Sequence, residues 1–301
     1  MLWHKSNIIT SHLRDNLFNE KQVELSVLRL DKIDPVVSGN KLFKLHYFLQ
    51  KALDNNLEGM VTYGGAYSNH LVATAYACRQ AGLKSAGIVR GEQPASLSHT
   101  LQACLQYGMQ LTFISRQQYD LKETEDFQQS LIAAHKNFLV VPEGGYHPLG
   151  AKGAALIMDL IDEDVTHICC AAGTLTTVAG LYLMINATQQ IVCIPVLKNM
   201  QDLTGRMAYL TGVPLNPDRL KIINDYHFGG YAKKTPELIN FMNSLYCHYQ
   251  LPSDFVYTGK MMFGVFDLIE KDFFNKGSKI VCLHTGGLQG NLSLSPGTLL
   301  F

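Results

Sequence analysis

Two lysines stand at the start of a predicted helix, where a positive charge is unfavourable. The stretch SGNKLFKLHYFLQKAL, residues 38–53, begins with small polar residues and then places apolar side chains at helical spacing. Lys41 and Lys44 fall in the first turn of this helix, where the helix dipole is positive. Because an ammonium group that is poorly tolerated gives up its proton more readily, this turn could carry a reactive amine.

Three turns rich in glycine and hydroxyl residues could bind an anion. YGGAYSNH (63–70), AAGTLTTVAGL (171–181) and LHTGGLQG (283–290) each follow an apolar run. In parallel sheets, ligands bind where strands end, and helix N-termini there present free amide groups. The first turn could equally be a helix cap formed by Ser68 or Asn69. The second suits a phosphate group, although it is neither a Walker A loop nor a GxGxxG motif.

Other catalytic chemistries have less support in the sequence. There is no HExxH pair, so no metal site is expected, and there is no GxSxG elbow around a serine nucleophile. His70 and His147 each follow or lie within a glycine-rich turn. Either histidine could line a pocket or serve only as a hydrogen-bonded neighbour.

Short apolar or β-branched runs alternate with helical patterns along the chain. Expected strands are residues 60–63, 85–89, 110–115, 138–141, 167–171, 191–196, 221–223 and 279–284. Expected helices, besides the one above, include residues 70–82, 98–108 and 180–188. This alternation predicts an α/β fold with mostly parallel sheets flanked by helices. The Gly- and Pro-containing stretch 143–153 marks a boundary between two lobes.

Composition excludes several classes of protein. The 301 residues carry no formal net charge, which argues against a nucleic-acid partner. The N-terminal stretch lacks an apolar signal core, and the most apolar window is broken by Gly173 and Gly180, so no membrane span is expected. Seven cysteines without a CxxC pair favour reduced thiols and a cytoplasmic location.

The order of the motifs identifies a family resemblance that spans residues 38–287. SGNKLFKL, YGGAYSNH, EGGYHPLGAKGA, the Gly/Thr loop before AGL, FGGYAKKTPE, VYTGK and LHTGG follow one another. This succession resembles the pyridoxal-phosphate enzymes of the 1-aminocyclopropane-1-carboxylate deaminase and D-cysteine desulfhydrase family, which have the tryptophan-synthase-β-like fold. The resemblance implies pyridoxal 5'-phosphate in a crevice between two lobes, a small amino-acid substrate and a homodimer. Residues 1–43 with 148–301 would form the larger lobe, and 44–147 the smaller one inserted in it.

The resemblance also assigns cofactor-binding residues. Lys41, not Lys44, would bind the cofactor covalently, and Asn69 would bond its phenolate oxygen. Leu175 departs from the family pattern, because members often have a second glycine there. The phosphate cup would consist of Gly173, Thr174, Leu175, Thr176 and Thr177.

Catalytic roles and the substrate follow from the same resemblance. Ser68 would bind the substrate carboxylate or move a proton, and Tyr231 and Tyr257 match two tyrosines that handle protons. Where members open the cyclopropane ring, the residue after the tyrosine of Tyr-x-Gly-Lys is a glutamate near the pyridine nitrogen. This chain has Thr258, and a hydroxyl partner (Thr258 or Thr285) does not enforce a protonated ring.

We therefore expect β-elimination of a D-cysteine-like substrate, with ring opening as the alternative. Two further alternatives are a non-catalytic protein that binds a phosphorylated metabolite and a flavodoxin-like interaction domain. Neither accounts for Lys41, Asn69 and the threonine cup occurring together.

Overall fold

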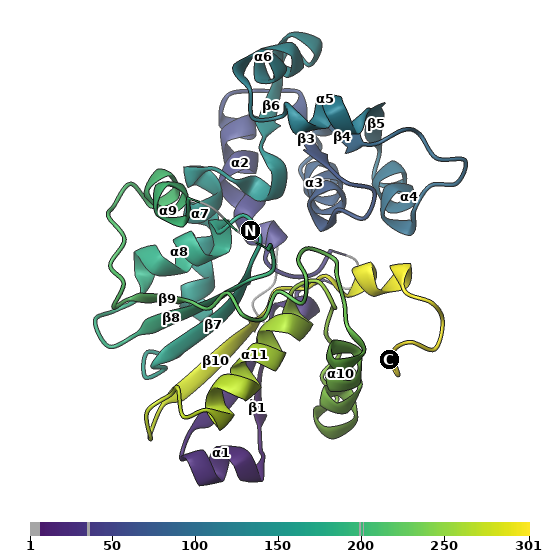
Figure 1. The fold of residues 1–301 in the computed structure, drawn as a ribbon. Coiled ribbons are helices and arrows are strands. Elements are labelled where there is room, and N and C mark those ends of the chain that lie inside the picture. The colour runs from purple at the N-terminus through teal and green to yellow at the C-terminus, as the bar shows by residue number, and fades with distance from the viewer. Residues whose placement is uncertain (1–6, 35–36, 199, 201) are drawn as a thin grey trace.

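The strands form two sheets in a computed structural model, which describes residues 7–34, 37–198, 200 and 202–301. Figure 1 shows one sheet in the lower and one in the upper part of the view. In the described ranges the larger sheet has the order β1 (Thr10–Leu13), β2 (Glu24–Arg29), β10 (Lys279–His284), β7 (His167–Ala172), β8 (Gln190–Pro195) and β9 (Leu220–Ile222). The smaller has the order β5 (Met109–Ile114), β4 (Lys84–Arg90), β3 (Gly59–Gly64) and β6 (Phe138–Val141).

Both sheets are parallel except for the pairing of β1 with β2. The helices that connect and cover the strands are α1 (Asn16–Lys21), α2 (Lys41–Asp54), α3 (Asn69–Gln80), α4 (His99–Gln106), α5 (Arg116–Asp120), α6 (Glu125–Ala134), α7 (Pro148–Ala155), α8 (Thr176–Met184), α9 (Leu203–Thr211), α10 (Pro236–Tyr249) and α11 (Thr258–Glu270). The predicted α/β class is confirmed, since parallel strands need helical crossovers.

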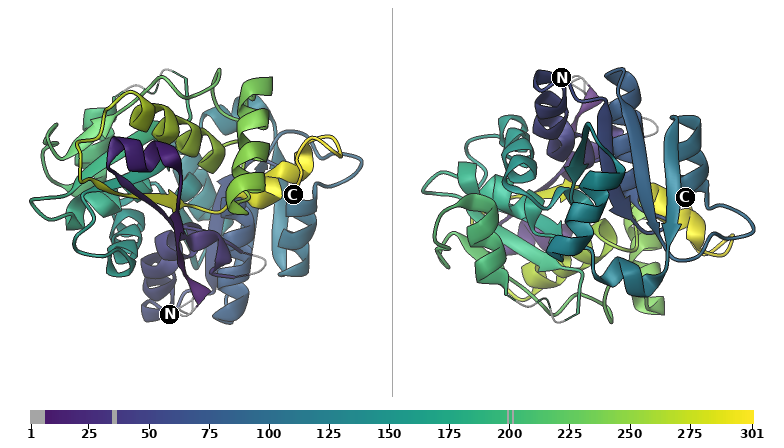
Figure 2. Two further views of the ribbon diagram at one scale, coloured as in Figure 1. Left: turned by 90° about the horizontal axis from the view of Figure 1, so that it is seen from below. Right: turned by 90° about the horizontal axis from the view of Figure 1, so that it is seen from above.

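The larger sheet is covered on both faces at β7, which explains why this strand is apolar at successive positions. Successive residues of β7 alternate between two apolar clusters: Ile168 packs in the cluster that contains residues of α8, whereas Cys169 packs in the cluster that contains residues of α11. Figure 2 shows α1 in purple beside α11 in yellow-green. A strand buried on both faces needs apolar side chains at consecutive positions.

The two sheets share a continuous core around α2. The largest apolar cluster contains Leu45 of α2, Met60 of β3 and Ile168 of β7. Helix α2 also packs against α3 and α7. Because these apolar contacts extend from one sheet to the other, the start of α2 is held firmly between them.

Two features of the fold differ from the sequence prediction. Strands β1 and β2 were not expected, because TSHL and ELSVLR mix polar and apolar residues and lack a long apolar run. The helix expected at 180–188 occupies Thr176–Met184 instead. It ends early because Asn186 forms a local turn, in which its Oδ1 accepts a hydrogen bond from the amide of Thr188 over 2.9 Å.

The division into lobes 1–43 with 148–301 and 44–147 stays a prediction, and residues 1–6, with which the first lobe would begin, lie outside the described residues. Of the helices in the described ranges, none combines the length and apolar character needed to cross a bilayer.

Candidate active site

The first turn of α2 is fixed against the end of β10 by a close backbone contact. Gly39 has a φ of +89°, and a Cβ atom there would lie 1.9 Å from the carbonyl oxygen of Thr285. The amide of Asn40 donates to the same oxygen over 3.3 Å. Only glycine combines this approach with this backbone conformation. Residue 39 therefore determines where the chain enters the helix that begins at Lys41.

A pocket with about 500 Å³ of open space, including its mouth, lies at this junction. Segments far apart in the sequence build it: α2, the start of α3, the loop between β7 and α8, the residue before α11, and the end of β10. The wall includes both lysines, one tyrosine predicted to be catalytic and most residues predicted for the cofactor: Lys41, Lys44, Tyr257, Asn69, Gly173, Thr174, Leu175, Thr177 and Thr285.

The loop from β7 into α8 forms a cup of backbone amides. Leu175 lies at the N-cap with φ +64° and ψ −8°, the left-handed conformation that glycine adopts most easily. Leu175 therefore adopts a backbone conformation that is less favourable for a residue with a Cβ atom than for the glycine often found there in the family. Thr176 lies beside the pocket, with its Oγ1 2.9 Å from that of Thr174. In the described structure α8 has no side-chain cap, so its first amides are free to bind an anion.

Hydrogen bonds connect Lys41 with this cup through Asn40. The Nζ of Lys41 donates to Oδ1 of Asn40 over 2.9 Å, and Nδ2 of Asn40 donates to Oγ1 of Thr177 over 2.8 Å. Asn40 is a site residue that sequence reasoning missed, although it directly precedes Lys41. Its side chain fixes the direction of the amine relative to the cup.

Burial lowers the pKa of both lysines. It brings the pKa of Lys41 down to about 8, while the negative charge of Asp254 acts in the opposite direction. The pKa of Lys44 falls well below its usual value, first because of burial and then because of the charge on Lys41. The position of Lys44, three residues after Lys41 on one helical face, predicts either a solvated side chain or a charge that lowers the pKa of Lys41. Instead Lys44 is 4% exposed and its Nζ donates to the carbonyl of Gly144 over 3.3 Å.

The lowered pKa of Lys41 gives a testable pH dependence. In the cofactor-free protein, acetylation of Lys41 by acetic anhydride should reach half its maximal rate near pH 8, about two units below Nα-acetyl-lysine, because the neutral amine reacts. Peptide mass spectrometry over a pH series would separate Lys41 from Lys44. A midpoint near that of the free amino-acid derivative would contradict the assignment of Lys41 as a readily deprotonated amine.

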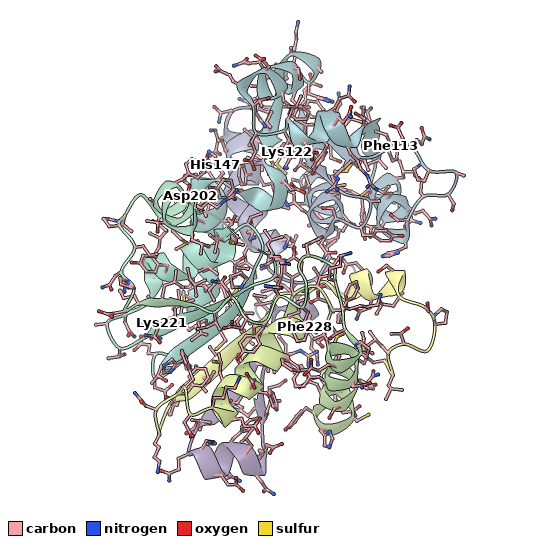
Figure 3. The ribbon with its side chains drawn as sticks, in the orientation of Figure 1. Phe113, Lys122, His147, Asp202, Lys221 and Phe228 are labelled. Atoms are coloured by element: carbon pink, nitrogen blue, oxygen red, sulfur yellow. The ribbon has the colours of Figure 1, made fainter. Side chains whose placement is uncertain are left out.

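Neither of the two histidines left open by the sequence is among the described residues that line the pocket. His147 caps α7, where its Nδ1 accepts a hydrogen bond from the amide of Leu149 over 3.0 Å; Figure 3 labels it beside α7. His70 is 2% exposed, and burial together with the charges of Lys41 and Lys44 lowers its pKa to about 3. His70 therefore stays neutral at physiological pH.

The predicted hydroxyl residues are divided between the pocket and its surroundings. Tyr257 lines the pocket, and the Nζ of Lys41 lies 5.9 Å from the centre of its ring. Tyr231 is 53% exposed, and its ring lies edge to face with that of Tyr257 at 6.0 Å. Ser68 caps α3 and accepts a hydrogen bond from the amide of Leu71 over 3.3 Å. Thr258 is fully buried next to Tyr257, and its Oγ1 lacks a hydrogen-bond partner among the described residues.

Asp254 is a buried carboxylate that sequence reasoning missed. It is 1% exposed and accepts hydrogen bonds from the amides of Val256 (3.0 Å), Tyr257 (2.7 Å) and Thr258 (2.9 Å). These bonds order the turn before α11 and so place Tyr257 at the pocket. The signal in the sequence was an aspartate four residues before Thr258, where an acceptor suits the free amides at a helix start.

The donors in the pocket suit a phosphorylated aldehyde. The uncapped start of α8 can bind a phosphate group, and Lys41 offers an amine of lowered pKa. Among the described residues, Oδ1 of Asn69 is buried without a hydrogen-bond partner, which leaves a polar group available to a ligand. Two helix-flanked sheets with an anion cup and a reactive amine between them define an α/β enzyme that holds a phosphorylated carbonyl cofactor.

Comparison with known families agrees with this description. Residues 14–286 match the family model of the pyridoxal-phosphate dependent enzymes, and the chain belongs to that family. Its cofactor is therefore pyridoxal 5'-phosphate, as the sequence predicted, and the residues of the pocket fit it. The prediction of an enzyme is confirmed, and the non-catalytic alternatives are set aside.

Known relatives resemble nearly the whole chain. A mitochondrial protein of Arabidopsis thaliana named bifunctional D-cysteine desulfhydrase/1-aminocyclopropane-1-carboxylate deaminase is 29% identical, covering 89% of this chain and 73% of that one. The D-cysteine desulfhydrase of Klebsiella pneumoniae is 24% identical, covering 91% and 89%. A crystal structure titled as a homologue of 1-aminocyclopropane-1-carboxylate deaminase has a TM-score of 0.78 and 27% identity, covering 95% and 90%. The predicted family resemblance is confirmed.

Proposed function

We propose that the protein eliminates the β-substituent of a small amino acid, with D-cysteine as the model substrate. With water, the reaction converts cysteine to pyruvate, hydrogen sulfide and ammonia. Relatives named for both desulfhydrase and deaminase activities support the reaction class. Their names do not choose between the two substrates, so the choice rests on the pocket.

The absence of a carboxylate from the pocket wall carries the proposal. Among the described residues that line the pocket there is no Asp or Glu. The carboxylate of Asp254 already accepts hydrogen bonds from three backbone amides. Thr285 lines the wall and Thr258 lies buried beside it, so the available partners for a ring nitrogen are neutral hydroxyls.

A neutral partner favours elimination over ring opening. When bound, the cofactor supplies an electron-withdrawing ring that stabilises negative charge on the substrate's α-carbon. A carboxylate beside the ring nitrogen would favour its protonation and strengthen that effect, whereas a hydroxyl does not enforce it. Sulfide is a good leaving group, so its elimination needs less stabilisation of negative charge on the α-carbon. Opening the cyclopropane ring needs more, because the α-carbon of that substrate carries no proton whose removal could start the reaction.

The site residues divide this work as follows. The amides of residues 173–177 would hold the phosphate, and Asn69 would orient the ring. Lys41 would hold the carbonyl carbon, and its amine, once released by the substrate, would move the α-proton. Ser68 and Tyr257 are the alternative proton carriers. Burial raises the pKa of Tyr257 well above its usual value, so its hydroxyl stays protonated at neutral pH and can donate a hydrogen bond.

Substrate competition tests the proposal. The purified holoenzyme should release pyruvate and sulfide from D-cysteine with a kcat/KM at least ~100-fold above that for ammonia release from 1-aminocyclopropane-1-carboxylate, because the pocket wall offers neutral partners. L-cysteine run in parallel would report the stereochemical preference. Faster ammonia release from the cyclopropane substrate would overturn the proposed order.

We also propose that the enzyme is a homodimer in the cytoplasm. Exposed apolar side chains on α8 and α9, which pack together, support a covered surface there: Leu183 is 40%, Met184 53% and Tyr209 50% exposed. Light scattering would measure the mass in solution.

A further inference from the structure

Lys260 is a fully buried cation that has no part in the chemistry described above. It lies on α11, three residues after Tyr257, and its side chain has 0% exposure. Its Nζ donates to the carbonyl oxygens of His227 over 2.9 Å and of Gly230 over 2.7 Å. A buried ammonium group is costly unless acceptors surround it, so these two bonds must hold the carbonyls firmly.

The two carbonyls belong to a loop with an unusual backbone. Phe228, Gly229, Gly230 and Ala232 all have positive φ angles, of 51°, 89°, 118° and 53°. Left-handed conformations at Phe228 and Ala232 are unfavourable for residues with a Cβ atom. Within the loop, the amides of Gly230 and Lys233 donate to the carbonyl oxygens of His227 over 3.0 Å and of Gly230 over 3.1 Å, and Lys260 adds a second donor to each of these oxygens from outside the loop.

A further contact anchors the start of the loop on α11. Phe228, which is labelled in Figure 3, lies edge to face with Phe263 of α11 at 4.9 Å. Lys260 and Phe263 are three residues apart and so lie on the same side of the helix. The loop is therefore fastened to one face of the helix whose first turn follows Tyr257.

The fastened loop carries Tyr231 against Tyr257, which lines the pocket. Tyr231 directly follows Gly230, whose carbonyl Lys260 binds, and its ring meets that of Tyr257 at 6.0 Å. Since Tyr231 is 53% exposed, few contacts of its own fix its position. Its placement depends on the backbone of the loop.

We infer that Lys260 is a positioning residue, which clamps loop 227–231 and thereby holds Tyr231 against Tyr257 for the reaction. The ammonium group reaches no substrate in this role and acts through Tyr231. That Tyr231 serves the reaction rests on the proton-handling role that the family resemblance assigns to it and on the proposed function, whereas the clamp itself rests on neither.

Limited proteolysis tests the clamp without reference to activity. Lys233 and Lys234 are exposed, directly beyond the clamped residues, and are potential trypsin sites. In holoenzyme carrying Lys260→Met, trypsin should cleave after them ~10- to 100-fold faster than in the wild type, because two charge-assisted hydrogen bonds are lost. Lys260→Arg, which keeps a charged donor, should be cleaved at an intermediate rate. Lys276→Met, an exposed lysine before β10, is the matched control and should leave the rate unchanged.

Kinetics then test whether the clamp acts through Tyr231. Lys260→Met should lower kcat for D-cysteine ~10-fold with little change in KM, and the loss should shrink below twofold in a Tyr231→Phe background, because the positioned hydroxyl is then already absent. An unchanged cleavage rate in Lys260→Met overturns the clamp, and equal losses in both backgrounds overturn the action through Tyr231. If the proposed substrate is not turned over at all, the proposed function fails while the cleavage rates still decide the clamp. Unaltered visible absorption of bound cofactor in each variant shows that the fold is intact.

Discussion

Replacing Lys41 by alanine is expected to abolish covalent attachment of the cofactor and to reduce kcat by at least ~10³-fold, because the nucleophilic amine is lost. Lys41 lines the pocket at the start of α2, and burial lowers its pKa to about 8. Borohydride treatment followed by peptide mass spectrometry measures the attachment. In the wild type the cofactor mass should appear on Lys41, and in Lys41→Ala it should disappear.

Two comparisons make this prediction specific. Lys51→Ala changes an exposed lysine on the same helix and should alter neither attachment nor kcat. Lys44 provides the stricter comparison, because it lies in the same pocket and its pKa is also lowered. Cofactor mass on Lys44 in the wild-type protein would contradict the assignment to Lys41.

Much of the fold could be predicted because buried parallel strands consist of consecutive apolar residues, which can be recognised in the sequence. The run HICCA was expected as a strand at 167–171 and is β7, whose residues are buried on both faces by α8 and α11. Strand β1 escaped prediction, because a strand that pairs on one side and stays partly solvated carries no such run. Its pairing with β2 depends on the sheet and not on its own residues.

The parts of the site formed by residues close together in the sequence could be predicted. The parts that depend on contacts between distant segments could not. Lys41, Asn69 and the cup at 173–177 stand in local motifs, and the fold brings them to one pocket. The burial of Lys44 depends on the loop at Gly144, a hundred residues away, so the sequence around Lys44 could not reveal it. The assigned catalytic roles of these residues stay predictions for the experiments proposed above.

Asp254 shows how much of the site rests on a residue outside every motif. Its carboxylate accepts hydrogen bonds from three backbone amides. Its negative charge also raises the pKa of both Lys41 and Lys260, which burial lowers. One side chain therefore orders the turn that carries Tyr257 and stabilises the charged forms of two lysines. Substituting it should change both the stability of the protein and the reactivity of the amine.

Asp254→Ala is expected to lower the Tm of the cofactor-free protein on the order of 10 °C, because three amides lose their acceptor in a buried position. Asp254→Asn keeps one carbonyl acceptor and should lose less. In both variants the acetylation midpoint of Lys41 should fall below pH 8, since removing a negative charge disfavours the ammonium form and so lowers its pKa. Differential scanning fluorimetry and the acetylation series described above measure the two effects.

Asp267→Asn is the control for the Asp254 variants. It shows whether the loss of any carboxylate near α11 changes the Tm and the acetylation midpoint of Lys41, or only the loss of Asp254. Asp267 lies on α11 and accepts hydrogen bonds from Tyr226 and Lys271. Its removal should lower the Tm without moving the acetylation midpoint of Lys41, because its charge is not among those that act on that amine. If Asp254→Asn left that midpoint at pH 8, the carboxylate would act only through the backbone of the turn. A fall in the midpoint would establish that Asp254 holds back the deprotonation of Lys41, so that the pKa of the amine is a balance between burial and one buried carboxylate.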